Sequence, residues 1–205
     1  MRTTAFPAAR AGATERMERM RAGNPLEMET DVSAITTAEQ KRKIETLVDA
    51  GMKQGARVYY QKQISAAVPP GGIYYAPTLL TGVSNDMRLA REEIFGPVLV
   101  ALEFEGEDEA AELANDTEYG LAAGVWSRDV EKAKRVAGRI DAGTVWVNDY
   151  HLLSAAAPRG GFKRSGTGRE LGLEGIMEFT QTRHIFISED GDIDEVAYGL
   201  ILPDR

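Results

Sequence analysis

The chain has 205 residues and a formal net charge of −8, with 43% hydrophobic and 27% charged residues. These proportions are ordinary for a globular protein, and the length suits one substantial core or two small ones. The acidic balance disfavours nucleic acid as a partner, because negative charge repels the phosphate backbone. The chain contains no cysteine, which excludes disulfides and thiol nucleophiles among its own residues.

No apolar stretch is long enough to cross a bilayer, and the first residues lack the apolar core of a secretory signal. We therefore expect a cytoplasmic protein without a membrane partner. No grouping of His, Asp and Glu has the spacing of metal ligands, so no catalytic metal is expected.

The amino-terminal part predicts two helices. Residues 1–8 are expected to form a loose lead-in, and 9–21 are rich in Ala, Arg, Glu and Met, which favour a helix that ends at a Gly-Asn-Pro turn. Thr37 is a typical N-cap for a second helix, which should end near Gly51 or Gly55. The apolar residues of this second helix recur at helical spacing, at Ile44, Leu47 and Val48.

Beyond the second helix the pattern becomes extended, with three continuously apolar strands separated by two helices. Continuous apolarity is typical of strands buried on both faces, and the two tryptophans within these strands are expected to be core residues. Strand and helix alternate at the spacing of βαβ units, which predicts an α/β fold with a partly parallel sheet and flanking helices. The predicted elements are strand 56–60, a turn at 69–72, an extended segment at 73–83, strand 97–102, helix 107–115, strand 120–126, helix 129–140 and strand 143–148.

The carboxyl-terminal part begins with a loop rich in Gly and Ala at 149–168. A short helix near 172–177 and a final strand at 182–187 should follow. Residues 188–205 are expected to be an acidic tail, either a disordered extension or a strip that docks on a partner.

A carboxylate and an aromatic residue precede the Gly-Pro turn before strand 97–102. Glu93 could accept two hydrogen bonds from a ribose diol, and Phe95 could pack against a flat ring. The plainer interpretation is a helix-to-strand turn with solvated glutamates, and composition alone favours it.

Two further segments carry weaker signals. His151 follows strand 143–148, where α/β proteins place ligand groups, although a lone loop histidine is usually solvated. The glycines between 160 and 168 lack the Gly-Lys-Ser/Thr order of a P-loop. Lys163, Arg169 and Glu170 could form an ion-paired cluster of small energetic weight.

Five segments occur in a fixed order along the chain. They are Gly-Asn-Pro-Leu at 23–26, Asn-Asp-Met-Arg-Leu-Ala-Arg-Glu-Glu-Ile-Phe-Gly-Pro-Val at 85–98, Ala-Asn-Asp-Thr-Glu-Tyr-Gly-Leu-Ala-Ala at 114–123, Gly-Thr-Val-Trp-Val-Asn at 143–148 and Gly-Thr-Gly-Arg-Glu-Leu-Gly at 166–172. In this order they resemble the NAD(P)-dependent aldehyde dehydrogenase family. The resemblance implies an oxidoreductase that converts aldehydes to carboxylic acids, with a Rossmann-like cofactor domain, an α/β catalytic domain and an oligomerisation hairpin.

The resemblance also assigns roles to individual residues. It implies that Glu93 binds the nicotinamide ribose hydroxyls of NAD or NADP and that Phe95 packs near the nicotinamide. Leu153 and Arg159 fall in the loop that lines the aldehyde tunnel. Glu170 is similar to the second acidic residue that some members use as a proton relay, near Lys163.

Residues 9–181 resemble the catalytic domain beyond its nucleophile, and 182–187 resemble the strand that pairs with another subunit. The family's cysteine nucleophile, glutamate base and glycine-bearing cofactor half have no counterpart in this sequence. We therefore expect a truncated family member that is inactive alone, and that forms a homo-oligomer or needs a complementary amino-terminal half. Arg159 replaces an aromatic residue of many members, which favours an anionic or polar substrate.

Two alternatives remain open. The chain could be a non-catalytic structural or regulatory partner that joins a full-length relative through strand 182–187 by β-addition. It could also use another nucleophile, such as Ser165, Thr167 or Tyr150, although none follows a convincing base in the sequence.

Overall fold

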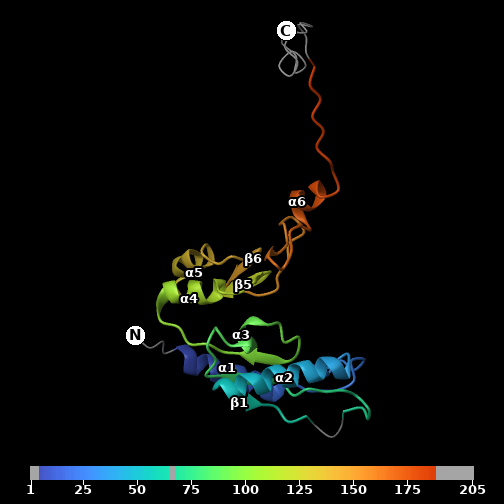
Figure 1. Cartoon of the computed structure of the whole chain (residues 1–205), viewed down its shortest axis with the longest axis vertical. Coiled ribbons are helices and arrows are strands. Elements are labelled where there is room, and N and C mark those ends of the chain that lie inside the picture. The colour runs from blue at the N-terminus through green and yellow to red at the C-terminus, as the bar shows by residue number, and fades with distance from the viewer. Residues whose placement is uncertain (1–4, 65–67, 188–205) are drawn as a thin grey trace, which may run out of the picture. The chain divides into compact units, whose positions relative to one another are not determined.

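The computed structural model describes residues 5–64 and 68–187, and it divides into two compact units (Figure 1). The first unit comprises the described residues of Met1–Leu152 together with Gly160–Thr167. The second comprises Leu153–Arg159 and the described residues of Gly168–Arg205. The acidic tail expected at 188–205 lies outside the described residues.

Helix α1 (Ala5–Arg19) begins earlier than the sequence predicted. The expectation of a loose lead-in is therefore wrong for residues 5–8, while 1–4 lie outside the described residues. Pro7 is compatible with this early start, because the first turn of a helix has no intrahelical use for the N–H group that proline lacks. Met17 of this helix is buried.

Helix α2 (Ala38–Gln54) confirms both of its predicted ends. The Thr37 hydroxyl accepts a hydrogen bond from the Gln40 backbone N–H at 3.1 Å, which satisfies one free donor of the first turn. Gly55 ends the helix in the left-handed conformation, with φ of 115°. The predicted apolar stripe is buried, and its members are Ile44, Leu47 and Val48.

The first sheet has three strands in the order β1 (Arg57–Gln61), β2 (Thr78–Thr81) and β3 (Val98–Val100). Strand β1 pairs with β2 in antiparallel orientation, and β2 pairs with β3 in parallel orientation. The sheet is thus partly parallel, as predicted. Every residue of the central strand β2 is buried, because it has a paired neighbour on each side.

The main core lies where α2 meets β2 and the short helix α3 (Arg88–Arg91). Ile44 of α2 and Leu80 of β2 have no exposed surface. A glycine is required at position 51, since a Cβ there would lie 2.5 Å from Leu89 Cδ2. Close packing of α2 against α3 therefore leaves no room for a side chain at this position.

Strand β3 departs from the prediction of burial on both faces. Leu99 has 51% of its surface exposed, and β3 is an edge strand of the described sheet. An apolar sequence cannot distinguish a central strand from an edge strand whose outer neighbour is absent, because both have the same composition.

Of the predicted strand–helix series, β5 (Ala122–Val125), α5 (Val130–Ala137) and β6 (Thr144–Val147) form a βαβ unit, whereas β3 lies in a different sheet. The prediction of burial on both faces is also wrong for β5 and β6, in which no residue is fully buried. Strands β5 and β6 are parallel, and Ala122 is opposite Thr144. The Asp129 carboxylate caps α5 by accepting a hydrogen bond from the Lys132 N–H at 3.0 Å. The crossover and its cap thus follow from sequence alone.

The two tryptophans differ from the expected core positions. Trp126 is 62% exposed, because β5 ends one residue before it. Trp146 of β6 is half-buried, and its Nε1 donates a hydrogen bond to the Leu152 carbonyl at 2.8 Å.

Three short elements complete the first unit. Helix α4 (Gly106–Asn115) follows β3, and β4 (Tyr119–Gly120) pairs with β7 (Phe162–Lys163) in antiparallel orientation. This pairing brings residues 160–167 against the loop that follows α4, although the two segments are far apart in the sequence.

The second unit contains α6 (Gly172–Met177), as predicted, and an isolated bridge between Arg159 and Glu170. Residues 182–187 form no strand in the described part of the chain. Three apolar side chains of this segment are largely exposed. They are Ile185 at 71%, Phe186 at 79% and Ile187 at 75%. The predicted strand has no partner among the described residues, and its pairing with another subunit stays a prediction.

The core assignment predicts a large difference between two leucines of the same sheet. Leu80→Ala should lower the free energy of unfolding by about 2–5 kcal/mol, since it leaves a cavity in a packed core. Leu99→Ala is the matched control and should cost less than about 1 kcal/mol, because its side chain is half exposed. Urea unfolding followed by circular dichroism measures both, and equal losses would contradict the assignment.

Candidate functional site

The turn between α3 and β3 carries the carboxylate and the aromatic residue noted in the sequence. Glu93 and Phe95 are exposed, Phe95 to 68%, whereas Ile94 between them is buried in the core. Among the described residues, the Glu93 carboxylate has no hydrogen-bond or ion-pair partner. The turn therefore presents a free acceptor beside an aromatic face.

Gln40 of α2 holds this turn in place. Its Nε2 donates hydrogen bonds to the backbone carbonyls of Ile94 and Phe95, each at 2.9 Å. The backbone of this turn is strained, because Phe95 has a φ of 54°, which is costly for a residue other than glycine. The two hydrogen bonds from Gln40 help to stabilise it. Sequence reasoning missed Gln40, since helical periodicity does not show which polar residue reaches a turn far along the chain.

Glu93 borders two open pockets of the first unit. The larger has a volume of about 520 Å³ and is formed by three separate segments, whereas the smaller, of about 360 Å³, follows the α3–β3 turn. The larger pocket is lined by Ala90, Arg91, Glu92, Glu93, Thr117, Tyr119, Leu121, Arg164 and Ser165. The smaller is lined by Leu89, Ala90, Glu92, Glu93, Ile94, Phe95, Gly96, Val98, Val100 and Leu102.

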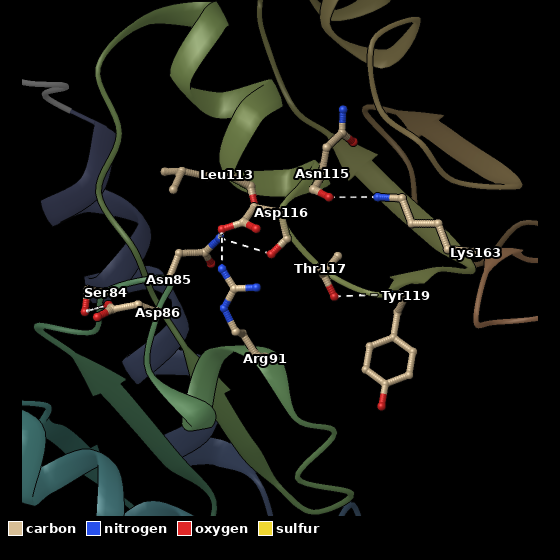
Figure 2. Close-up of polar contacts among 10 residues, drawn as sticks. All are labelled: Ser84, Asn85, Asp86, Arg91, Leu113, Asn115, Asp116, Thr117, Tyr119 and Lys163. Carbon is tan, nitrogen blue, oxygen red and sulfur yellow. Dashed lines mark hydrogen bonds and ion pairs between the residues drawn. The ribbon is translucent and has the colours of Figure 1, made fainter.

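The carboxyl end of α4 connects the segments that form the larger pocket (Figure 2). Asp116 Oδ2 accepts hydrogen bonds from the Arg91 guanidinium at 2.6 Å and from Asn85 Nδ2 at 2.9 Å. Lys163 Nζ of β7 donates to the Asn115 carbonyl at 2.7 Å, where the helix dipole favours a cation. One helix end thus contacts both neighbouring walls of the pocket.

Strand β7 is fixed to the loop after α4 by further contacts. The Gly120 N–H donates to Ser165 Oγ at 3.0 Å, and the Arg164 N–H donates to the Glu118 carbonyl at 2.9 Å. The Arg164 guanidinium also forms an ion pair with the Glu118 carboxylate. Ser165 therefore has a structural hydrogen bond, and its use as an alternative nucleophile stays untested.

Charged neighbours shift the acidity of groups around the pocket. A hydrogen bond from Arg88 holds the pKa of Glu92 below its ordinary value. The pKa of the Tyr119 phenol is raised, first by desolvation and then by the negative charges of Glu118 and Glu93. Tyr119 therefore remains a neutral phenol facing the same pocket as Glu93.

The predicted substrate-loop residues and the proton-relay candidate lie in the second unit. Leu153 is about half exposed, and Arg159 is partly buried. Arg159 and Glu170 exchange two backbone hydrogen bonds, each at 2.7 Å, while the Glu170 side chain is exposed. Their proposed roles at an aldehyde tunnel and in a proton relay stay predictions.

Lys163 has two partners within the first unit. Its amino group lies 3.6 Å from the Asp141 carboxylate and donates a hydrogen bond to the carbonyl at the end of α4. Arg169 and Glu170 belong to the second unit, so the ion-paired cluster that the sequence suggested stays a prediction.

The end of β6 carries an exposed aromatic cluster. The rings of Tyr150 and His151 are stacked with centroids 5.0 Å apart, and Tyr150 contacts Trp146 edge-on at 5.4 Å. Both Tyr150 and His151 are exposed, which agrees with the plainer interpretation of a solvated loop histidine.

No group of three or more His, Asp or Glu side chains among the described residues is arranged to hold a metal ion. None of the helices in the described ranges is both long and apolar enough to span a bilayer.

Comparison with known proteins points to one family. The sequence model of the aldehyde dehydrogenase family matches residues 3–185. The betaine aldehyde dehydrogenase of Bacillus subtilis (strain 168) is 44% identical over 177 residues, which is 86% of this chain and 36% of that protein. The fluoroacetaldehyde dehydrogenase of Streptantibioticus cattleyicolor is 43% identical over 178 residues, or 86% of this chain and 35% of that protein.

The fold agrees with solved structures of such enzymes. A crystal structure of a double mutant of betaine aldehyde dehydrogenase from Staphylococcus aureus, in complex with NAD+ and with a BME-modified cysteine, matches with a TM-score of 0.84 and 38% identity. The match covers 90% of this chain and 37% of that one. The chain thus spans a little over a third of the length of the relatives it matches.

The role of Gln40 predicts a local effect. Gln40→Leu removes two hydrogen bonds to the turn, so it should speed amide hydrogen exchange at 93–96 and lower the free energy of unfolding by about 1 kcal/mol. Gln54→Leu, at the exposed end of the same helix, should leave exchange in the turn unchanged. Mass spectrometry of exchanged peptides distinguishes the two, and identical exchange in both variants would contradict the role.

The Asp116 network predicts a pH dependence. Arg91 and then Asn85 hold the pKa of the Asp116 carboxyl below its ordinary value. A lowered folded-state pKa gives stability that is present above the unfolded pKa of about 3.9 and is lost as pH falls through the folded pKa. Asp116→Asn should therefore unfold at lower urea than the parent chain at pH 7, and the difference should vanish in strong acid. A difference that is constant across this pH range would argue against the ion pair.

Proposed function

Because the chain belongs to the aldehyde dehydrogenase family, we propose that it supplies the nicotinamide end of an NAD(P)+ site and one wall of an aldehyde pocket. The observation that carries the proposal is the Glu93–Phe95 turn. It offers an unpaired carboxylate and an exposed aromatic ring, held by Gln40 at a strained backbone. A carboxylate that accepts hydrogen bonds and an aromatic face are the groups that a ribose diol and a nicotinamide ring can bind.

The residues present fit this cofactor group. The Glu93 carboxylate can accept both hydroxyls of the nicotinamide ribose, and the face of Phe95 can pack against the nicotinamide ring. The cofactor, when bound, supplies the hydride acceptor for aldehyde oxidation. The Phe95 ring would exclude water from one side, and Glu93 would orient the ribose. The solved relative of Staphylococcus aureus that matches this chain contains NAD+.

On the substrate side, we propose that Leu153 and Arg159 line the aldehyde pocket. Leu153 would provide an apolar contact, whereas the Arg159 guanidinium would attract an anionic or polar substituent of the aldehyde. No ion-pair partner of Arg159 is found among the described residues. Glu170 would accept or release a proton in a relay toward solvent.

We further propose that this chain needs a second chain segment for turnover. It contains no cysteine to attack an aldehyde and form a thioester. The matched relatives are more than twice as long as this chain, so a complementary segment could bring a nucleophile and the remaining cofactor contacts. Residues 182–187 would help to hold such a partner or a second copy, since an extended apolar strip readily adds to a sheet edge.

A second candidate function follows from the same strip. Ile185, Phe186 and Ile187 are mostly exposed, which suits a non-catalytic partner that caps a full-length relative by β-addition. This second function requires no cofactor binding, so a reconstitution assay that measures turnover can distinguish it from the first.

The test is reconstitution of activity. The chain is mixed with a cysteine-bearing fragment of the Bacillus subtilis relative, comprising the part of that enzyme this chain does not match, and aldehyde-dependent NADH formation is followed. We expect no turnover from either piece and turnover from the mixture. Activity of the chain alone would contradict the proposed dependence, and a mixture that associates without turnover would favour the capping partner.

Two controls sharpen this assay. Glu93→Gln should raise the KM for NAD+ about ten-fold, since the uncharged amide accepts a weaker hydrogen bond. An aldehyde that carries a carboxylate should be preferred over betaine aldehyde, and Arg159→Leu should remove the preference. An unchanged preference would exclude Arg159 from the substrate pocket.

A further inference from the structure

We infer that Asp116, just beyond α4, is a positioning residue for Glu93 and acts on it through Arg91. The inference rests on the proposed role of Glu93 in cofactor binding. Arg91 and Asp116 are 25 residues apart, so their contact joins two separate walls of the larger pocket (Figure 2).

Hydrogen bonds hold the backbone around Asp116 in place. Its backbone N–H donates to the Glu112 carbonyl at 2.9 Å, and its own carbonyl accepts from Asn85 Nδ2 at 3.2 Å. The preceding residue, Asn115, is fixed on both sides of its side-chain amide. Asn115 Nδ2 donates to the Arg139 carbonyl at 2.7 Å, and its Oδ1 accepts from the Asp141 N–H at 2.8 Å. Asp116 therefore belongs to an anchored helix end rather than to a free loop.

Glu93 lies between two side-chain anchors. On its amino-terminal side, Arg91 bonds Asp116, and on its carboxyl-terminal side, Gln40 bonds the carbonyls of Ile94 and Phe95. If the Arg91 anchor is removed, the turn can pivot about the Gln40 contacts. Because a displacement of about 1 Å can cost a large factor in a reacting complex, small pivots of the Glu93 carboxylate matter.

The neighbouring ion pair cannot provide this constraint. Arg88 Nη2 donates a hydrogen bond to Glu92 Oε2 at 3.0 Å, within one helical turn. This pair therefore does not connect α3 to another element. An exposed pair of that kind contributes little to stability. The Arg91–Asp116 pair is equally exposed but joins two walls, so its effect is on geometry more than on global stability.

The first measurement uses the full chain alone and reads hydrogen exchange at 92–95. Asp116→Ala should speed exchange there about ten-fold, while the amides of α2 and β2 should speed up far less, in line with the small loss of global stability expected for an exposed ion pair. The control is Asp108→Ala, which removes a similar exposed ion pair from the same helix, with Arg139 at 2.7 Å. Arg91→Lys should restore most of the protection that Arg91→Met loses.

Unchanged exchange in Asp116→Ala would overturn the inference. An equal, about ten-fold increase of exchange throughout α2 and β2 would also overturn it, since that result means general destabilisation rather than a local effect on the turn. Equal effects of the Asp108 and Asp116 variants would show that loss of any ion pair of α4 suffices.

The second measurement uses the reconstituted mixture and a double-mutant cycle. Asp116→Ala should raise the KM for NAD+ about ten-fold with little change in kcat, as Glu93→Gln does, and the double variant should be no worse than either single one. Additive effects would overturn the inference, because Asp116 would then act by another route. If Glu93→Gln leaves the KM unchanged, the proposed cofactor role fails, whereas the exchange experiment still decides whether Asp116 positions the turn.

Discussion

The close approach of α2 to the turn between α3 and β3 is the constraint on which the first unit depends. A Cβ at Gly96 would lie 2.4 Å from Ile44 Cδ1, so any other residue at this position would force Ile44 to move. Ile44 is completely buried, and Gln40 on the same helix bonds the turn. One helix therefore sets both the hydrophobic core and the direction in which Glu93 and its neighbour point.

The candidate site is a product of tertiary contacts between short segments. Its larger pocket combines residues of α3, of the loop after α4 and of β7, which are held together by hydrogen bonds at the end of α4. Each bond alone is exposed and worth little. Together they fix the walls, because every segment is bonded to the same helix end and none can move without breaking several contacts.

Large apolar surfaces remain open on this chain. Leu99 of the edge strand β3, Phe95 in the turn before β3 and the three apolar residues at 185–187 are half or more exposed. Apolar area of this extent is usually covered by another chain or segment. A chain that spans a little over a third of its relatives, and that carries one end of a proposed cofactor site, would gain both burial and activity from a complementary segment.

The sequence by itself determined the family, the βαβ unit and both ends of α2, because caps, glycines and helical periodicity act over a few residues. It also indicated the Glu93–Phe95 turn as a candidate site. The cofactor role expected for that turn depended on the other four family motifs, because composition alone favoured a solvated turn. Tertiary structure alone decided that Leu99 and Trp126 are exposed, since composition does not reveal which strand lies at an edge or where it ends. It alone revealed Gln40 and the contacts of Asp116, because such hydrogen bonds join residues whose separation along the chain carries no periodic signal.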